Sequence, residues 1–115
     1  MHPDARKLLW DSREAVERVL RFTAGKQFAD YEADELLRSA VERQLEIVGE
    51  ALGKLRHVDP GTARAIQSLS RAVGLRNVLI HGYATVDDRI VWGVVETNLR
   101  YLRDQIVALL DQRSE

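Results

Sequence analysis

The sequence has no cysteine, only two prolines and 6% aromatic residues in 115 positions. Without cysteine there is neither a disulfide framework nor thiolate chemistry. No stretch approaches the roughly 18 consecutive apolar residues that a membrane-spanning helix needs. The first 20 residues are interrupted by charges every few positions, which is unlike a signal peptide. We therefore expect a soluble, cytoplasmic protein with no membrane association.

The composition is that of a globular protein, with 45% hydrophobic and 30% charged residues. The length predicts one domain, spanning residues 1–115. A chain of this size buries roughly two thirds of its unfolded surface, which is enough for a core without stabilising disulfides or metals.

Acidic residues are missing from one segment. The net charge of −1 excludes a strong overall attraction to nucleic acid. Between Gly61 and Val86, however, there is no Asp or Glu, while Arg64, Arg71 and Arg76 all lie there. Such a segment suits a ligand that carries phosphate. A chance fluctuation in a buried helix is the alternative.

Two long helices are predicted in the first half of the chain. Leucines, valines and alanines recur at helical spacing from Pro3 to Thr23, and Gly25 is a plausible stop. The second helix is predicted from Tyr31 to Arg56, with Asp30 as its N-cap. Its apolar positions are spaced by four or three residues: Leu37, Val41, Leu45, Val48, Leu52 and Leu55.

Two more helices are predicted in the second half. The turn residues Pro60 and Gly61 precede a helix from Ala63 to Ile80, for which Thr62 is the expected cap. Asp87 and Asp88 are expected to start a fourth helix. Its apolar positions are Val91, Val95, Leu99, Leu102, Ile106 and Leu109. The predicted fold is therefore all-α, an antiparallel four-helix bundle with short loops, with Trp10 and Trp92 as core or interface anchors.

The stretch "RNVLIHGY", Arg76 to Tyr83, concentrates the functional question. Asn77 and His81 are four residues apart and share a helix face, whereas Arg76 and His81 are separated by about 140° around the axis. One regular helix therefore cannot aim both at the same atom. Either Gly82 ends the helix and lets the following residues turn back, or a second copy of the chain completes the site across a two-fold axis.

These residue types suit phosphodiester cleavage without a metal. Arginine offers a fixed charge and a planar fork for phosphate oxygens, and histidine exchanges a proton near neutral pH. Because His81 is expected in the last helical turn, the helix dipole favours its imidazolium form and a general-acid role. A surface Arg76, a helix-capping His81 and a packing Tyr83 are the purely structural alternative.

Other candidate residues lie on the second predicted helix. Glu46 and Glu50 share a face and could support Arg76 or a basic partner, although a solvated charged face is the simpler interpretation. Gly49 and Gly53 also share a face, either for close helix packing or to make room for a cleft. With no cysteine and no close histidine pair, we expect no metal site and no cofactor.

The octet and its flanks resemble the HEPN-domain family, specifically the HepT toxins that occur beside minimal nucleotidyltransferase antitoxins. "RNVLIHGY" has the R-x4-H-x-Y form of that family. "AVERQLEIVGEALGKL" (Ala40–Leu55) and "TVDDRIVWGVVETNL" (Thr85–Leu99) are similar to the family's flanking segments. The resemblance covers about Leu36 to Leu110.

The resemblance implies a homodimeric helical bundle that cleaves RNA without a metal as the toxin of a toxin–antitoxin pair. It implies that Arg76 and His81 are the catalytic pair, with Asn77 as an accessory. It also implies that the partner nucleotidyltransferase adenylylates Tyr83 and so neutralises the toxin. Two departures bear on substrate fit and partner docking: Gly82 stands where the family often has an acid, and "AIQSLSRAVGL" lacks an expected Pro-Trp pair.

Two other functions fit the same residues. One is a non-catalytic helical module that binds nucleotide or nucleic acid and docks the nucleotidyltransferase. The other is a purely structural dimerisation bundle. The intact pair of Arg76 and His81 favours the enzyme over both.

Overall fold

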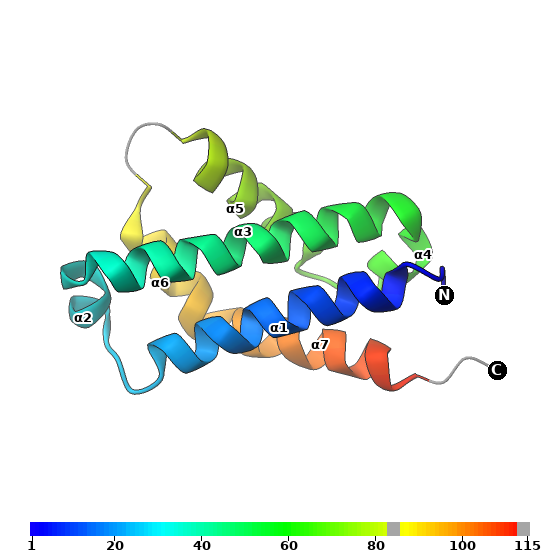
Figure 1. Cartoon of the computed structure of the whole chain (residues 1–115), viewed down its shortest axis with the longest axis horizontal. Helices are drawn as coiled ribbons and strands as arrows, with labels where there is room; N and C mark the ends of the chain where they lie inside the picture. The colour runs from blue at the N-terminus through cyan, green and yellow to red at the C-terminus, as the bar shows by residue number, and fades with distance from the viewer. Residues whose placement is uncertain (83–85, 113–115) are drawn as a thin grey trace.

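The computed structural model describes residues 1–82 and 86–112 of the chain. Within these residues the chain forms seven helices and no strand, which confirms the all-α prediction for this part (Figure 1). In chain order they are α1 (Ala5–Thr23), α2 (Phe28–Ala33), α3 (Glu35–Val58), α4 (Pro60–Ala63), α5 (Leu69–His81), α6 (Asp88–Thr97) and α7 (Leu99–Asp111).

The core lies between the long helices. α1 packs on α3 along much of its length, and α7 packs on α1. α1 runs antiparallel to both, and α5 leans against α3 at the side away from α1 (Figure 1). In the described part of the chain, none of the helices is long and apolar enough to cross a membrane.

The predicted apolar positions of the second and fourth helices are all buried. They lie on α3, α6 and α7, and they meet Leu9, Val16 and Val19 of α1 in one hydrophobic cluster. Gly25 is confirmed as the stop after α1, because it adopts a positive φ of 72° that suits glycine.

The predicted second helix is wrong at its start, because the chain breaks at Asp34. Asp34 has an extended backbone, and its carboxylate accepts a hydrogen bond from the Leu37 N–H at 3.0 Å as the N-cap of α3. Asp30 instead belongs to the short α2, where its carboxylate accepts from the Gln27 N–H at 2.8 Å. Asp34 therefore caps the long helix in place of Asp30.

The predicted third helix also divides. Asp59, not Thr62, is the N-cap of the short α4, and Thr62 donates to the Asp59 carboxylate through its N–H at 3.1 Å and its hydroxyl at 2.7 Å. The chain then turns, burying Ile66, before α5 starts at Leu69.

The predicted fourth helix starts correctly at its Asp87 cap but is two helices, separated at Asn98. The Thr97 hydroxyl donates to the Gly93 carbonyl at 2.6 Å, and its oxygen lies 2.9 Å from the Asn98 side-chain oxygen. A threonine hydroxyl bonded to the carbonyl four residues earlier often bends a helix, and the bend here falls at Asn98.

The two tryptophans have different environments. Trp92 is buried and lies against Tyr31, with 5.2 Å between ring centres, so its prediction as a core residue is confirmed. Trp10 is 47% exposed, and the guanidinium of Arg13 lies 4.2 Å from its ring centre. Trp10 is therefore not a core residue.

Candidate active site on α5

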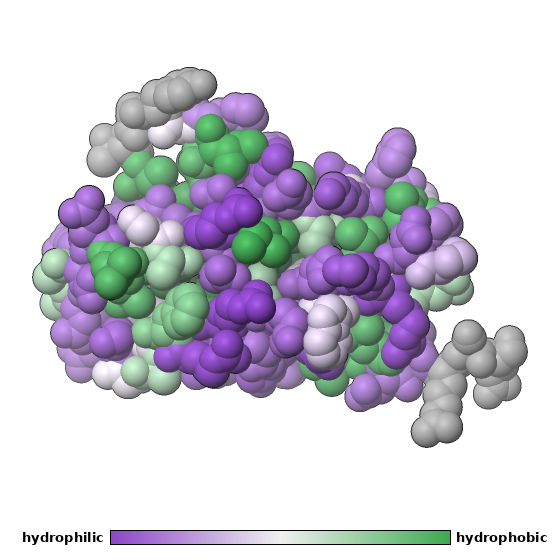
Figure 2. Space-filling view, in the orientation of Figure 1, coloured by the Kyte–Doolittle hydropathy of each residue, from purple (hydrophilic) through white to green (hydrophobic). Residues whose placement is uncertain are grey.

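The helix that carries the motif is the least buried of the longer helices. Leu69 is the buried residue of α5, and the rest of the helix is half-buried or exposed. Val78 is 53% exposed although it is apolar, and hydrophobic surface is visible where α5 projects from the molecule (Figure 2). The packing of α5 is mainly with α3.

Arg76 faces α3 and is half-buried. Its Nη1 donates to the Asn77 side-chain oxygen at 3.2 Å. Its Nε is shielded from solvent and has no hydrogen-bond partner among the described residues. The predicted neighbours Arg76 and Asn77 are thus joined, and the guanidinium retains donors for a ligand.

Gly49 of α3 allows Arg76 to take this position. A β-carbon at Gly49 would lie 2.7 Å from the Ala72 carbonyl oxygen and would overlap the Arg76 β-carbon. Neither atom is the end of a flexible side chain, so α5 itself would have to move. The prediction that Gly49 serves close helix packing is confirmed. The atoms that pack against Gly49 include the β- and γ-carbons of Arg76.

His81 lies in the last turn of α5, as the sequence predicted; it is the final residue of the helix, one beyond the predicted end at Ile80, and is exposed. The helix ends at Gly82, whose N–H donates to the Val78 carbonyl at 2.7 Å. Because α5 is helical from Leu69 through His81, Arg76 and His81 leave it in different directions. Among the described residues no hydrogen bond joins the two side chains. Tyr83 lies outside the described residues.

The two glutamates named from the sequence do not pair with Arg76 in the described part of the chain. Glu46 lies 3.4 Å from Arg43 in an ion pair along α3. Glu50 is exposed and lines the same hollow as Arg76. Neither makes an ion pair with Arg76 here, so their supporting role stays a prediction.

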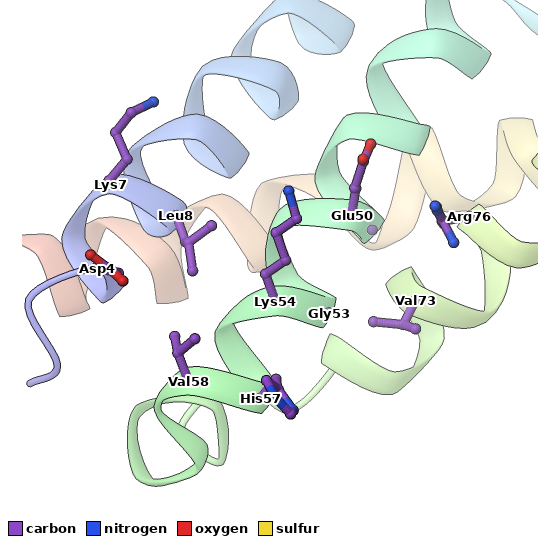
Figure 3. Close-up of a pocket in the computed structure, with 11 residues that line it drawn as sticks. Asp4, Lys7, Leu8, Glu50, Gly53, Lys54, His57, Val58, Val73 and Arg76 are labelled. Atoms are coloured by element: carbon purple, nitrogen blue, oxygen red, sulfur yellow. The ribbon is translucent and has the colours of Figure 1, made fainter.

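A hollow of about 610 Å³ adjoins Arg76, and we call it the α3 trough (Figure 3). Its walls are Asp4, Lys7 and Leu8 at the start of α1, and Val73 and Arg76 of α5. Its floor is formed by residues of α3: Gly49, Glu50, Gly53, Lys54, His57 and Val58.

The sequence analysis did not connect the trough residues Lys54 and His57 with Arg76. Lys54 and His57 are 22 and 19 positions before it, and only the packing of α5 on α3 brings them to one surface. The sequence carried part of this information, because Lys54 directly follows Gly53, and Gly49 lies one helical turn before Gly53.

No group of three or more His, Asp or Glu side chains in residues 1–82 and 86–112 is arranged to hold a metal ion. The charged groups on this face are the guanidinium of Arg76, the ammonium groups of Lys7 and Lys54, and the carboxylates of Asp4 and Glu50. The Lys7 ammonium is already held by Asp11 at 2.7 Å. Arg76 and Lys54 make no ion pair in the described part of the chain, so their charges are the ones on this face that no carboxylate offsets directly.

Comparison with known proteins identifies the family of this chain. The family described as "Ribonuclease HepT-like" matches residues 12–109, which include the whole of α5. "Probable ribonuclease HepT" of Thermococcus cleftensis is 33% identical over 88% of this chain and 91% of its own length.

Two further proteins with ribonuclease names are similar to this chain. "Putative RNase TTE0752" of Caldanaerobacter subterraneus subsp. tengcongensis is 31% identical, over 96% of this chain and 94% of that protein. "Putative RNase MJ1380" of Methanocaldococcus jannaschii is 29% identical, over 90% and 94%. No solved structure matches the chain significantly. The family match extends over most of the chain and includes the helix with Arg76 and His81, so the chain belongs to the HepT-like ribonuclease family.

Proposed function

We propose that this protein is the toxin of a toxin–antitoxin pair and that it cuts RNA internally without a metal ion. The observation that carries the proposal is the placement of Arg76, Asn77 and His81 on one exposed helix inside the family match. Arg76 has donors for phosphate, and His81 is accessible to a proton acceptor in the substrate.

The reaction is an attack by the RNA 2′-hydroxyl on the adjacent phosphorus. Neutral His81 accepts the hydroxyl proton and becomes an imidazolium, Asn77 can hydrogen-bond the hydroxyl as it reacts, and Arg76 stabilises the charge that builds on the phosphate oxygens. An imidazolium at His81 then protonates the 5′-oxygen as its bond to phosphorus breaks. The products are a 2′,3′-cyclic phosphate and a 5′-hydroxyl, and this step consumes no water and uses no metal ion.

An RNA cleavage assay tests this proposal directly. We expect the wild-type protein to cut single-stranded RNA in EDTA and to leave 2′,3′-cyclic phosphate ends. Activity that is lost in EDTA and returns with Mg²⁺ would overturn the metal-free mechanism. No cleavage under either condition would favour a non-catalytic module that binds nucleic acid.

We further propose that the functional unit is a homodimer. Arg76 packs toward α3 while His81 is exposed at the helix end, so one chain does not bring them together among the described residues. A second copy against the exposed apolar side of α5 would cover Val78 and could supply the missing group.

Mixed dimers test this arrangement. Chains with Arg76→Ala and chains with His81→Ala should each be inactive alone. Mixing them should restore part of the activity if each site draws Arg76 from one chain and His81 from the other. No recovery in confirmed mixed dimers would show that each site is complete within one chain.

Tyr83 is proposed as the control point, modified with AMP by the partner nucleotidyltransferase. It follows His81 by two residues, so the added phosphate would lie near the cations that bind RNA. After incubation with partner and ATP, the intact wild-type protein should gain the mass of AMP and Tyr83→Phe should not. Equal labelling of the two proteins would exclude Tyr83 as the target.

A further inference from the structure

The two glycines in the floor of the α3 trough have different packing environments. Gly49 is required by the close approach of α5, as described above. A β-carbon at Gly53 would instead lie 3.8 Å from the Val73 Cγ2, which is an ordinary van der Waals contact. Glycine inside a helix costs roughly 0.5–1 kcal/mol relative to alanine. Helix packing therefore does not account for Gly53, and its missing side chain leaves the floor of the trough open.

The trough combines apolar side chains with positive charge. Leu8, Val58 and Val73 line it together with Gly53, and Val73 is the residue that a β-carbon at Gly53 would contact. Lys54 is exposed and, among the described residues, is in no ion pair. Figure 3 shows the α3 residues between those of α1 and α5, with Lys54 standing on α3 and Arg76 on α5.

Two carboxylates also border the trough. Glu50 lies one helical turn before Lys54, and Asp4 lies at the far wall beside α1. The Lys7 ammonium is bound to Asp11 at 2.7 Å. In the described part of the chain neither carboxylate makes an ion pair with Lys54 or Arg76. The trough therefore favours a ligand that places an anion at Lys54 and Arg76 and an uncharged group beside Gly53 and Val73.

We propose that the α3 trough binds one nucleotide of single-stranded RNA, next to the phosphate that Arg76 contacts. The base lies on the open floor at Gly53, and Lys54 binds the neighbouring phosphate. A volume of about 610 Å³ is within the usual range of small-molecule sites and accommodates a nucleotide. This inference rests on the proposed function for the identity of the polymer and extends it to residues outside the motif.

The phosphate contact is tested with Lys54→Ala. The probe is a fluorescent single-stranded oligonucleotide with 2′-O-methyl groups, which keeps bases and phosphates but lacks the attacking hydroxyl. Lys54→Ala should weaken binding about tenfold and lower the slope of log Kd against log salt by about 0.7, as loss of one phosphate contact predicts. The control is Lys26→Ala, which removes the same charge from an exposed position beyond the opposite end of α1. Equal affinities and slopes for the two variants would overturn the contact.

The base contact is tested with Gly53→Leu, which fills the floor while improving helix propensity. Binding of the oligonucleotide should fall about tenfold, which corresponds to the loss of about 1.4 kcal/mol of contact, with the unfolding midpoint unchanged or raised. Binding of inorganic polyphosphate, which has no base, should be kept by Gly53→Leu and weakened by Lys54→Ala. Wild-type oligonucleotide affinity in Gly53→Leu would overturn the base site.

The two proposals fail in different ways. If RNA is cut in EDTA but Lys54→Ala and Gly53→Leu bind the oligonucleotide like the wild type, only the trough proposal is wrong. If RNA is not cut while both variants lose binding, the trough stands as an RNA site and the catalytic proposal is wrong.

Discussion

α5 and α7 are both helices of 13 residues, but their burial differs sharply. Five residues of α7 are buried, and one residue of α5 is. The apolar residues of α7 recur every three or four positions, so they share one face toward the core. In α5, Val78, Leu79 and Ile80 are consecutive, so they cover most of the circumference and cannot all face α3.

This difference in burial separates the helices that stabilise the fold from the helix that carries the proposed catalytic residues. α7 and the helices it packs on hold the fold through buried hydrocarbon. α5 presents Arg76, Asn77 and His81 from a helix supported mainly on one side, where substrate and a second protein can reach it. The predictions below test that separation, from the largest expected effect to the smallest.

The core should be far more sensitive to truncation than α5. Leu52 is fully buried, so Leu52→Ala should lower the free energy of unfolding by about 2–5 kcal/mol in denaturant titrations. Val78→Ala should change it by less than about 0.5 kcal/mol, as expected for an exposed site. A large, concentration-dependent loss for Val78→Ala would instead show that a second copy buries α5 in solution.

His81→Ala should show the opposite pattern. We expect cleavage to fall by at least ~10²-fold, the usual contribution of a general acid or base, because the proposed mechanism gives the ring the proton transfer. Thermal unfolding should stay close to wild type, because His81 is exposed at the end of α5. Retained cleavage together with a midpoint several degrees lower would mean that His81 serves the fold.

The two glycines of α3 should respond to alanine with opposite signs. Gly49→Ala should cost about 1–3 kcal/mol of stability through overpacking against Ala72 and Arg76. Gly53→Ala should gain about 0.5–1 kcal/mol, because its β-carbon meets only an ordinary contact. Chemical denaturation of both variants checks this. Equal effects would mean that α5 is not held against α3 at Gly49.

Gly49→Ala should also displace Arg76, and NMR can follow this separately from stability. We expect the Arg76 Nε signal to shift in Gly49→Ala, because the two residues are in direct contact. A lower unfolding midpoint with an unchanged Arg76 signal and unchanged kcat would limit Gly49 to a structural role.

The smallest effect concerns Asp59, which ties the N-terminal segment to α4. Its carboxylate accepts the His2 N–H at 2.8 Å as well as the hydrogen bonds from Thr62, and these lower its pKa to about 2. A lowered pKa stabilises the fold above the ordinary carboxyl value of 3.8, and this contribution is lost as the pH falls through 2. Asp59→Asn should therefore reduce the loss of stability between pH 4 and 2 in denaturant titrations. An identical pH profile in the variant would show that the hydrogen bonds do not persist in solution.

Local patterns predicted the helical class and nearly all of the core, because burial follows periodicity when apolar residues lie on one face. The positions spaced by three and four on α3, α6 and α7 are buried as expected. Periodicity missed the helix breaks at Asp34 and Asn98, and it placed the cap of the third helix at Thr62 where the structure has Asp59. At Asp34 and Asp59 a carboxylate accepts a backbone N–H, and beside Asn98 the Thr97 hydroxyl donates to a backbone carbonyl; sequence periodicity does not record such bonds.

By itself, the sequence determined that this chain folds into helices, and it singled out Arg76, Asn77 and His81, because residue type and spacing along one helix are local properties. Only the tertiary structure decided that α5 is supported mainly by α3, that Gly49 bears directly on Arg76, and that Lys54 and Gly53 border the same trough as Arg76. Those relations join residues about 20 or more positions apart, so they depend on which faces of α3 and α5 meet. That choice is made by the burial of the whole core.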